Sequence, residues 1–230
     1  MEFGVFMMPN HPPHRDFAEG HYHDLDYLEF LDKAGFNEAW IGAHYTVPRE
    51  PCPAPDLMIA QALLRTENIR LCPGAYMLPF HHPAELAHRI AWLDHISRGR
   101  CYIGIGASGV TTDWAMFGID GMAGENREMA EESLEIMRLF WESEEPFEYQ
   151  GKFWSVKRPE DAIEGNFTYH IKPYTRRKAE YCSKSQDNWG KLIVANTCQI
   201  FLNLKFIAGI VCLRICRSFL IKKFSFFHQT

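Results

Sequence analysis

Residues 82–109 read HPAELAHRIAWLDHISRGRCYIGIGASG and join a helical pattern to a strand-like one. Pro83 lies where the first turn of a helix accepts proline, because an N–H group there has no intrahelical partner. The segment from Gly99 onward is apolar and ends in small residues, which is typical of a strand buried in a parallel sheet. The stretch therefore predicts a helix followed by a strand, the repeating unit of an α/β fold.

The same alternation extends in both directions. Leu25, Leu28 and Leu31 are spaced three apart on one helical face, and Gly35 follows where a helix commonly ends. The expected strands are residues 3–8, 38–45, 69–79 and 99–108, and the expected helices are residues 24–35, 56–68, 82–97 and 125–141. A hairpin is expected at 147–156 and one further short strand at 169–174.

Four strand–helix units with continuously apolar strands predict a parallel sheet covered by helices. A doubly wound sheet and a (βα)8 barrel both fit this pattern. In a barrel, ligands bind on the loops at the carboxyl ends of the strands. The sequence places polar and small residues in those loops, at Asn10–His14, His44–Tyr45, Tyr76–His82 and Gly106–Asp113. We therefore expect a ligand site there.

Composition narrows the class of protein. Of the 230 residues, 47% are apolar and 23% charged, which indicates a globular protein rather than a disordered one. The net charge of −5 gives no reason to expect nucleic acid as a partner. The seven cysteines are odd in number and form no CxxC motif, which favours a reduced, cytoplasmic context. The first residues show no basic region or cleavage site, so no signal peptide is expected.

The charge changes sign near residue 173. Residues 1–173 carry a net charge of −13 and contain all 13 prolines, whereas residues 174–230 carry +8. We expect a domain over 1–173 and an atypical tail over 174–230, explained by a reading-frame shift, a retained intron or a misassigned end. Residues 192–213 are long enough to span a bilayer, but the central Lys205 makes a membrane anchor unattractive.

Histidine is the main candidate for chemistry. His44, at the end of an expected strand, is either a general acid or base, because its ordinary pKa lies near neutrality, or a hydrogen-bonded histidine under a loop. The glycine-rich run at 104–109 admits a flat ligand or serves packing, and no GKS or GKT follows, which excludes a P-loop. Histidine clusters at 10–14 and 80–83 suggest a metal-dependent barrel hydrolase, but no HxH directly follows the first strand and the sequence has no HExxH, so we predict no metal. The acidic run at 128–135 is interpreted as a solvated helix face.

Four stretches together resemble the luciferase-like, flavin-dependent monooxygenases. They are MEFGVFMMP with the following PPH, GFNEAWIGAHY, the segment LPFHHPAELAHRIAWLDHISRGRCYIGIGASG with TDWAMFG, and the acidic helix ending in LFW. Within the family, these stretches are most similar to limonene 1,2-monooxygenase-type members, and the resemblance covers residues 1 to about 173.

The resemblance implies the N-terminal half of a (βα)8 TIM barrel. It also implies reduced FMN, with FAD or deazaflavin F420 as alternatives, supplied by a separate flavin reductase. The reduced flavin would react with O2 to form a C4a-peroxyflavin and oxygenate a small organic substrate, and the protein would act as a homo- or heterodimer. An F420-dependent oxidoreductase and a non-catalytic remnant or interaction subunit are the other readings.

The resemblance also assigns residues. His44 matches the active-site histidine, and Gly74–Ala75 falls where the family has a non-prolyl cis peptide under the flavin ring. Gly106 and Ala107 match positions beside the isoalloxazine, and Asp113 matches an acidic position in the following loop.

The sequence departs from the family pattern in two places. Ala43 stands where many relatives carry an acidic residue, so we expect His44 to lack a carboxylate partner. Strands five to eight and the flavin-phosphate site have no counterpart after Tyr174. We therefore expect two unpaired sheet edges, an exposed apolar inner face, and weak or no activity of this chain alone.

Overall fold

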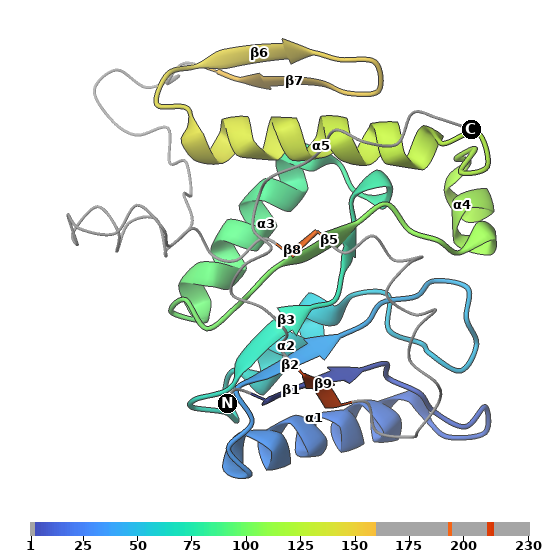
Figure 1. Ribbon diagram of the computed structural model, residues 1–230, viewed down its shortest axis with the longest axis vertical. Coiled ribbons are helices and arrows are strands. Elements are labelled where there is room, and N and C mark those ends of the chain that lie inside the picture. Colours follow the sequence, from blue (N-terminus) through green and yellow to red (C-terminus); the bar gives the residue numbers. More distant parts are fainter. Residues whose placement is uncertain (1–2, 160–192, 195–210, 214–230) are drawn as a thin grey trace.

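The computed structural model describes residues 3–159, 193–194 and 211–213 (Figure 1). Two predictions lie outside these residues, namely the short strand at 169–174 and the domain boundary near residue 173. The segment considered as a membrane anchor, residues 192–213, is described only at 193–194 and 211–213. Within the described part of the chain, no helix is long and apolar enough to cross a bilayer.

Two small sheets hold the strands of the α/β fold. In the first, β1 (Phe3–Met7), β2 (Glu38–Ile41) and β3 (Arg70–Pro73) are parallel, and β9 (Val211–Leu213) is antiparallel to β1. In the second, β4 (Tyr76–Met77), β5 (Gly104–Gly106) and β8 (Ile193–Val194) are parallel. The predicted α/β class is confirmed, and over the described residues the strands form no closed barrel. Strands β9 and β8 pair with β1 and β5, but both described sheets stay open and so keep edge strands, as expected for part of a barrel.

The third predicted strand is divided in two. Gly74 donates its N–H to the Ile41 carbonyl at 2.7 Å, whereas Tyr76, two residues later, pairs with Ile105. The peptide bond between Gly74 and Ala75 is cis, as the family resemblance predicted. The chain therefore changes its pairing partner at this bond, and the continuous strand expected over 69–79 becomes β3 and β4.

In the described part of the chain, five α-helices and one 3₁₀ turn connect and cover the strands. They are α1 (Phe17–Lys33), α2 (Pro55–Ala62), η1 (Leu78–Phe80), α3 (Pro83–Ile96), α4 (Thr111–Phe117) and α5 (Glu125–Glu142). Helix α1 begins earlier than predicted because the Asp16 carboxylate accepts the Ala18 and Glu19 N–H groups at 2.9 and 3.2 Å. It ends at Lys33, and Gly35 follows the last turn with a φ of +83°, the left-handed conformation that glycine adopts freely.

The core lies between the sheets and the helices that cover one face. Leu25, Leu28 and Leu31 of α1 are fully buried and share one cluster with Val5 and Ile41 of the first sheet. Burying such a leucine contributes about 1.5–3 kcal/mol. A second cluster joins β4 and β5 to α3 and α5. Alternate residues of the first sheet, such as Phe6 and Trp40, point to the opposite face and are only half-buried.

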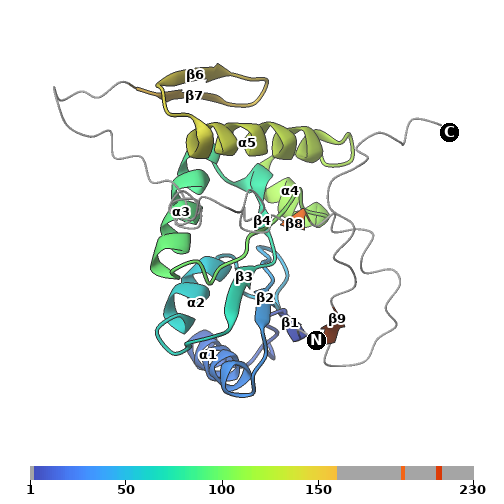
Figure 2. The same ribbon diagram turned by 60° about the vertical axis from the view of Figure 1, so that its left-hand side comes forward.

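The hairpin of β6 (Phe147–Gln150) and β7 (Ser155–Arg158) is confirmed and lies along α5 in both views (Figures 1 and 2). The Glu132 carboxylate accepts the N–H groups of three of the four connecting residues, Lys152, Phe153 and Trp154, at 2.8–3.2 Å. Glu128 pairs with Lys152 at 2.5 Å. The acidic run is therefore not merely a solvated face, because it binds the hairpin.

Candidate functional site

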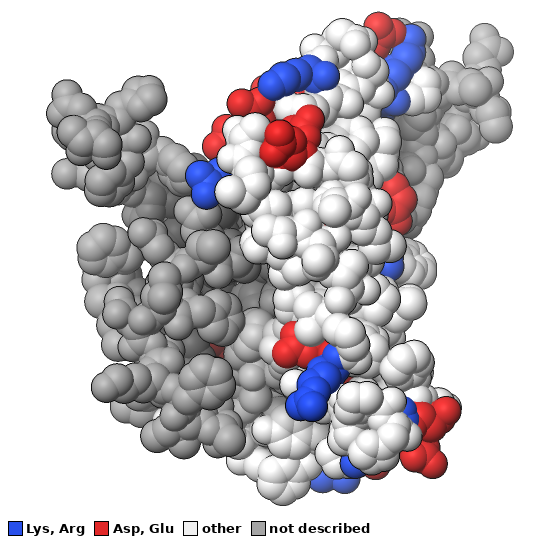
Figure 3. Space-filling model, turned by 90° about the vertical axis from the view of Figure 1, so that its right-hand side faces the viewer, with Lys and Arg blue, Asp and Glu red and all other residues white. Residues whose placement is uncertain are grey.

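The loops that follow β1 and β2 lie with α4 on the right-hand side of Figure 1, at the carboxyl ends of the strands. Figure 3 looks onto that side. Lys, Arg, Asp and Glu gather toward its two ends, and the middle of the described surface carries few of them. The edge predicted to bind a ligand is thus largely uncharged, which suits a small apolar molecule.

His44 begins a loop that closes on itself through hydrogen bonds. Its N–H donates to the Cys52 carbonyl at 3.1 Å, and the Glu50 N–H donates to the Val47 carbonyl at 3.0 Å. This turn brings Glu50 Oε2 to 3.1 Å from His44 Nε2, with the two side chains 20% and 22% exposed. The expectation that His44 lacks a carboxylate partner is therefore wrong. Ala43 does not supply one, but Glu50, six residues beyond the histidine, does.

Asp113 holds the same loop from α4. Its Oδ1 accepts the Thr46 N–H at 2.9 Å and the Thr46 hydroxyl at 2.5 Å, and the side chain is almost fully buried. The sequence placed Asp113 in a loop, but it lies in the first turn of α4, where an acidic residue is favoured by the partial positive charge of the helix end. Its described contacts fix Thr46, two residues after His44; its assignment to the cofactor stays a prediction.

A second histidine–carboxylate pair joins the loop after β1 to helix α1. His11 Nε2 is 2.8 Å from Asp24 Oδ2, and the two side chains are only 7% and 10% exposed. The His11 N–H also donates to the Arg49 carbonyl at 2.8 Å, which joins the β1 loop to the His44 loop. Burial raises the pKa of Asp24 above its ordinary value, against the opposing effect of His11.

The predicted cofactor residues with small side chains lie at adjacent strand ends. Gly74 and Ala75 follow β3, and Gly106 ends β5, where it pairs with Met77 of β4. Ala107 follows Gly106, and Asn126 of α5 donates to the Ala107 and Ser108 carbonyls at 2.9 and 3.1 Å. The structure therefore brings these four positions, together with His44, to one edge of the sheets.

Packing explains one glycine of the run at 104–109. A Cβ on Gly104 would lie 2.7 Å from the Pro73 carbonyl oxygen and 3.2 Å from the Trp40 ring, so no larger residue fits without a backbone shift. A Cβ on Gly74 would likewise meet Phe6 at 3.1 Å and Trp40 at 3.3 Å. For Gly104, packing is therefore a sufficient reason for glycine.

Three aromatic rings gather beside the His44 loop. Phe80 and Phe117 stack with centroids 4.3 Å apart, and Tyr45 meets their rings edge-on at 5.6 and 5.0 Å. Burial raises the pKa of Tyr45, and Asp113 adds to the shift while Arg89 opposes it. The Tyr45 phenol therefore stays protonated at neutral pH and adds no charge to this apolar cluster.

The histidine clusters considered for a metal have other contacts. His82 Nδ1 accepts the Ala84 N–H at 3.3 Å and caps α3, and His11 pairs with Asp24. Across the described ranges, no group of three or more His, Cys, Asp or Glu residues is arranged to hold a metal ion. Burial also raises the pKa of the Cys52 thiol to about 11, so it is not a thiolate at neutral pH.

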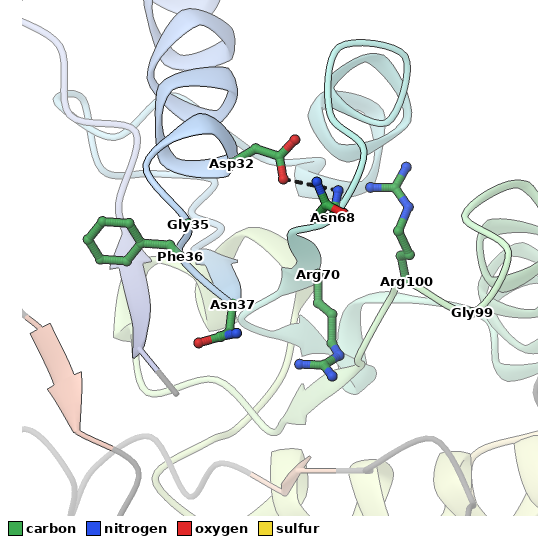
Figure 4. Close-up of a pocket in the computed structure, with 8 residues that line it drawn as sticks. All are labelled: Asp32, Gly35, Phe36, Asn37, Asn68, Arg70, Gly99 and Arg100. Carbon is green, nitrogen blue, oxygen red and sulfur yellow. Dashed lines mark hydrogen bonds between the residues drawn. The ribbon is translucent and has the colours of Figure 1, made fainter. Parts of the chain in front are cut away.

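An open cavity of about 410 Å³ lies at the opposite, amino-terminal ends of the strands. There Asp32 accepts the Glu67, Asn68 and Ile69 N–H groups at 2.7, 3.0 and 2.7 Å. Figure 4 shows the guanidinium groups of Arg70 and Arg100 pointing away from each other, and Arg100 donates to the Leu63 and Ile69 carbonyls. Asp32 and Arg100 thus bind backbone, and the Arg70 guanidinium lies over the Tyr102 ring at 5.1 Å from its centroid, so these groups do not converge on a ligand. The lining residues are Asp32, Gly35, Phe36, Asn37, Asn68, Arg70, Gly99 and Arg100.

Sequence reasoning missed Glu50, Thr46 and Asn126. A turn signal at Pro48, between His44 and an acidic residue, could have indicated that Glu50 returns toward the ring. No local signal indicates that Thr46 meets Asp113, 67 residues away, or that Asn126 reaches the loop after β5.

Comparison with known proteins agrees with this geometry. Residues 1–165 match the luciferase-like monooxygenase family. The chain is 38% identical over 159 residues to 2,5-diketocamphane 1,2-monooxygenase 1 of Pseudomonas putida, covering 69% of this chain and 43% of that protein. It is 36% identical over 137 residues to limonene 1,2-monooxygenase of Rhodococcus erythropolis, covering 60% and 35%.

A solved structure shares the fold. It is the oxygenating constituent of 3,6-diketocamphane monooxygenase from Pseudomonas putida, a type II Baeyer–Villiger monooxygenase in complex with FMN. The TM-score is 0.71 at 34% identity, over 76% of this chain and 48% of that chain. This chain therefore spans less than half the length of these relatives. The family match over most of its residues shows that the chain belongs to the luciferase-like monooxygenases.

Proposed function

We propose that this chain carries the histidine-bearing half of a flavin-dependent monooxygenase that inserts one oxygen atom from O2 into a small organic substrate. The observation that carries the proposal is the meeting of His44 with the small strand-end residues Gly74–Ala75 and Gly106–Ala107 at one largely uncharged edge. The relative whose structure contains FMN supports FMN as the flavin cofactor.

The residues present fit a planar ring. Gly74, Ala75, Gly106 and Ala107 carry at most a methyl group, so a flat ligand can approach the backbone there. Ring atoms of Phe6 and Trp40 lie 3.1 and 3.5 Å from the Cβ position on Gly74, so glycine leaves room for two aromatic side chains beside this backbone. These four residues would hold the isoalloxazine, and reduced FMN, when bound, supplies the electrons that activate O2.

The protein groups supply proton handling and a dry surface. His44 exchanges a proton with the bound ligand, because imidazole both donates and accepts near neutral pH. Tyr45, Phe80 and Phe117 cover the adjacent surface with apolar rings and reduce access of water. The substrate class that suits this surface is a small alicyclic molecule, such as the diketocamphane and limonene of the relatives' names.

Partners follow from the same relatives. The oxygenating constituent in the FMN-bound structure implies a second, reducing constituent, so we propose that a separate flavin reductase supplies reduced FMN.

We also propose that the protein acts as a homo- or heterodimer. Helices α2 and α3 expose Leu57 (60%), Trp92 (54%) and Ile96 (42%), and a subunit contact over these helices would remove the three side chains from water.

The test uses the 230-residue chain and a chimera in which residues 1–165 continue into the second half of 2,5-diketocamphane 1,2-monooxygenase 1. Reduced FMN is titrated anaerobically, ¹⁸O-labelled O2 is admitted with limonene or a diketocamphane, and products are weighed by mass spectrometry. We expect FMN binding by the chimera and one ¹⁸O atom in the product. Turnover independent of O2 would favour an F420-type hydride transfer, and absence of flavin binding by the chimera would contradict the proposal.

A further inference from the structure

The loop of residues 44–52 presents His44 in one fixed orientation. The ring follows a backbone that is closed by the His44–Cys52 and Glu50–Val47 hydrogen bonds and joined to α4 by Thr46. On one side, Nε2 lies 3.1 Å from the Glu50 carboxylate. On the other, Nδ1 is buried and makes no hydrogen bond with any residue that the structure describes.

The two contacts are not equivalent chemically. An ionised carboxylate can only accept hydrogen bonds, so the ring nitrogen that faces Glu50 must carry a proton. In a neutral imidazole one nitrogen carries the proton and the other holds the lone pair. The Glu50 contact therefore directs the lone pair of His44 to Nδ1, the atom that is shielded from bulk water.

We infer that Glu50 is a positioning residue that makes Nδ1 the basic atom of His44. A buried nitrogen with no protein partner is costly unless a ligand uses it, since a buried acceptor without a hydrogen bond loses about 1–3 kcal/mol. A proton released by a bound ligand would form an N–H bond at Nδ1, while the bonding electrons stay with the ligand. The imidazolium that results lies against the Glu50 carboxylate, which stabilises its positive charge. The use of this basic atom rests on the proposed function, whereas the protonation of the His44 ring can be tested without flavin.

The test is an NMR measurement on the 230-residue chain labelled with ¹⁵N-histidine, without flavin. Long-range ¹H–¹⁵N spectra identify which nitrogen of His44 carries the proton, with the resonance assigned from His44→Gln. We expect a proton on Nε2, shifted downfield by the carboxylate and protected from exchange, and none on Nδ1 at a pH where the ring is neutral.

Three variants separate positioning from general stability. Glu50→Leu should lose the protected Nε2 proton signal to exchange with water. Glu50→Gln, which keeps the shape and an accepting oxygen, should retain it with a smaller downfield shift. Glu67→Gln, an exposed glutamate at the opposite ends of the strands, should leave it unchanged. Methyl spectra report whether each variant is folded.

Two results would overturn the inference. One is a proton on Nδ1 in the wild type, and the other is an Nε2 signal that stays unshifted in both Glu50 variants. Neither depends on flavin or O2, so a failure here is distinct from a failure of the proposed monooxygenase activity.

Discussion

Two histidine–carboxylate pairs have their histidines in neighbouring loops, after β1 and β2, and differ in burial. His11–Asp24 is 2.8 Å long with side chains 7% and 10% exposed, whereas His44–Glu50 is 3.1 Å long with side chains 20% and 22% exposed. In a pair removed from water, each polar group is satisfied only by the other, so removal of one partner is costly. A partly exposed pair costs less to break and stays within reach of a ligand. We therefore propose that the buried pair stabilises the fold and that the partly exposed pair serves chemistry.

The largest effect should come from His44→Ala in the chimera described above. We expect oxygenation to fall by about 10²- to 10⁴-fold, the usual contribution of a general acid or base. Binding of reduced FMN should change little, because the flavin is proposed to contact strand-end backbone. Stopped-flow turnover and anaerobic flavin titration measure the two effects. Unchanged turnover would remove His44 from the mechanism.

Breaking the buried His11–Asp24 pair should reduce the stability of the protein rather than its activity. Asp24→Ala leaves His11 buried without its partner, so we expect a loss of about 3–5 kcal/mol in the free energy of unfolding. Asp26→Ala is the matched control two residues along the same helix. Its carboxylate is 71% exposed and pairs with Arg65, so the cost should be within about 1 kcal/mol. Urea denaturation followed by circular dichroism distinguishes them, and equal losses would contradict the comparison.

Packing around His11 gives a third, smaller effect. Glycine to alanine within a helix ordinarily stabilises by about 0.5–1 kcal/mol. At Gly20 of α1, however, an added Cβ would lie 2.4 Å from His11 Nδ1. We therefore expect Gly20→Ala to destabilise the protein by about 1–3 kcal/mol through overpacking. In a His11→Ala background the same change should become neutral or stabilising, and a double-mutant cycle measures this reversal.

These two pairs also show what the sequence can and cannot predict. His44 was identified because a strand pattern ends there and the family resemblance marks it, and the cis bond at Gly74–Ala75 was predicted by the same resemblance. Glu50 was missed because its position depends on a turn that hydrogen bonds close in three dimensions. The expected lack of a partner failed for a related reason. The sequence shows that Ala43 is not acidic, but not which later carboxylate returns to the ring.

The ends of helices and strands likewise include some that local sequence predicts and others that depend on distant contacts. Helix α5 matches its expected range within one residue, because its periodicity is regular and Gly124 precedes it in a left-handed conformation. Helix α2 ends at Ala62, earlier than expected, and the Thr66 hydroxyl then donates to the Ala62 carbonyl at 2.8 Å. The division of the third strand into β3 and β4 depends on pairing with β5, about 30 residues away, which no local pattern contains.

The smallest effect concerns a carboxylate that binds backbone instead of histidine. Burial alone would raise the pKa of Asp32, but the Glu67, Ile69 and Asn68 N–H groups, with Arg100 nearby, hold it below the ordinary value of 3.8. A carboxyl with a lowered folded pKa stabilises the protein above its unfolded pKa, and this contribution is lost as pH falls through the folded pKa. Asp32→Asn should therefore cost about 1–2 kcal/mol at pH 7, since hydrogen bonds to a charged acceptor become bonds to a neutral one. The difference from wild type should shrink as the pH falls below about 4. Urea unfolding across that pH range, with Glu67→Gln as control, measures the stability difference between Asp32→Asn and wild type. A difference independent of pH would show that Asp32 stabilises the protein through its shape and packing and not through its charge.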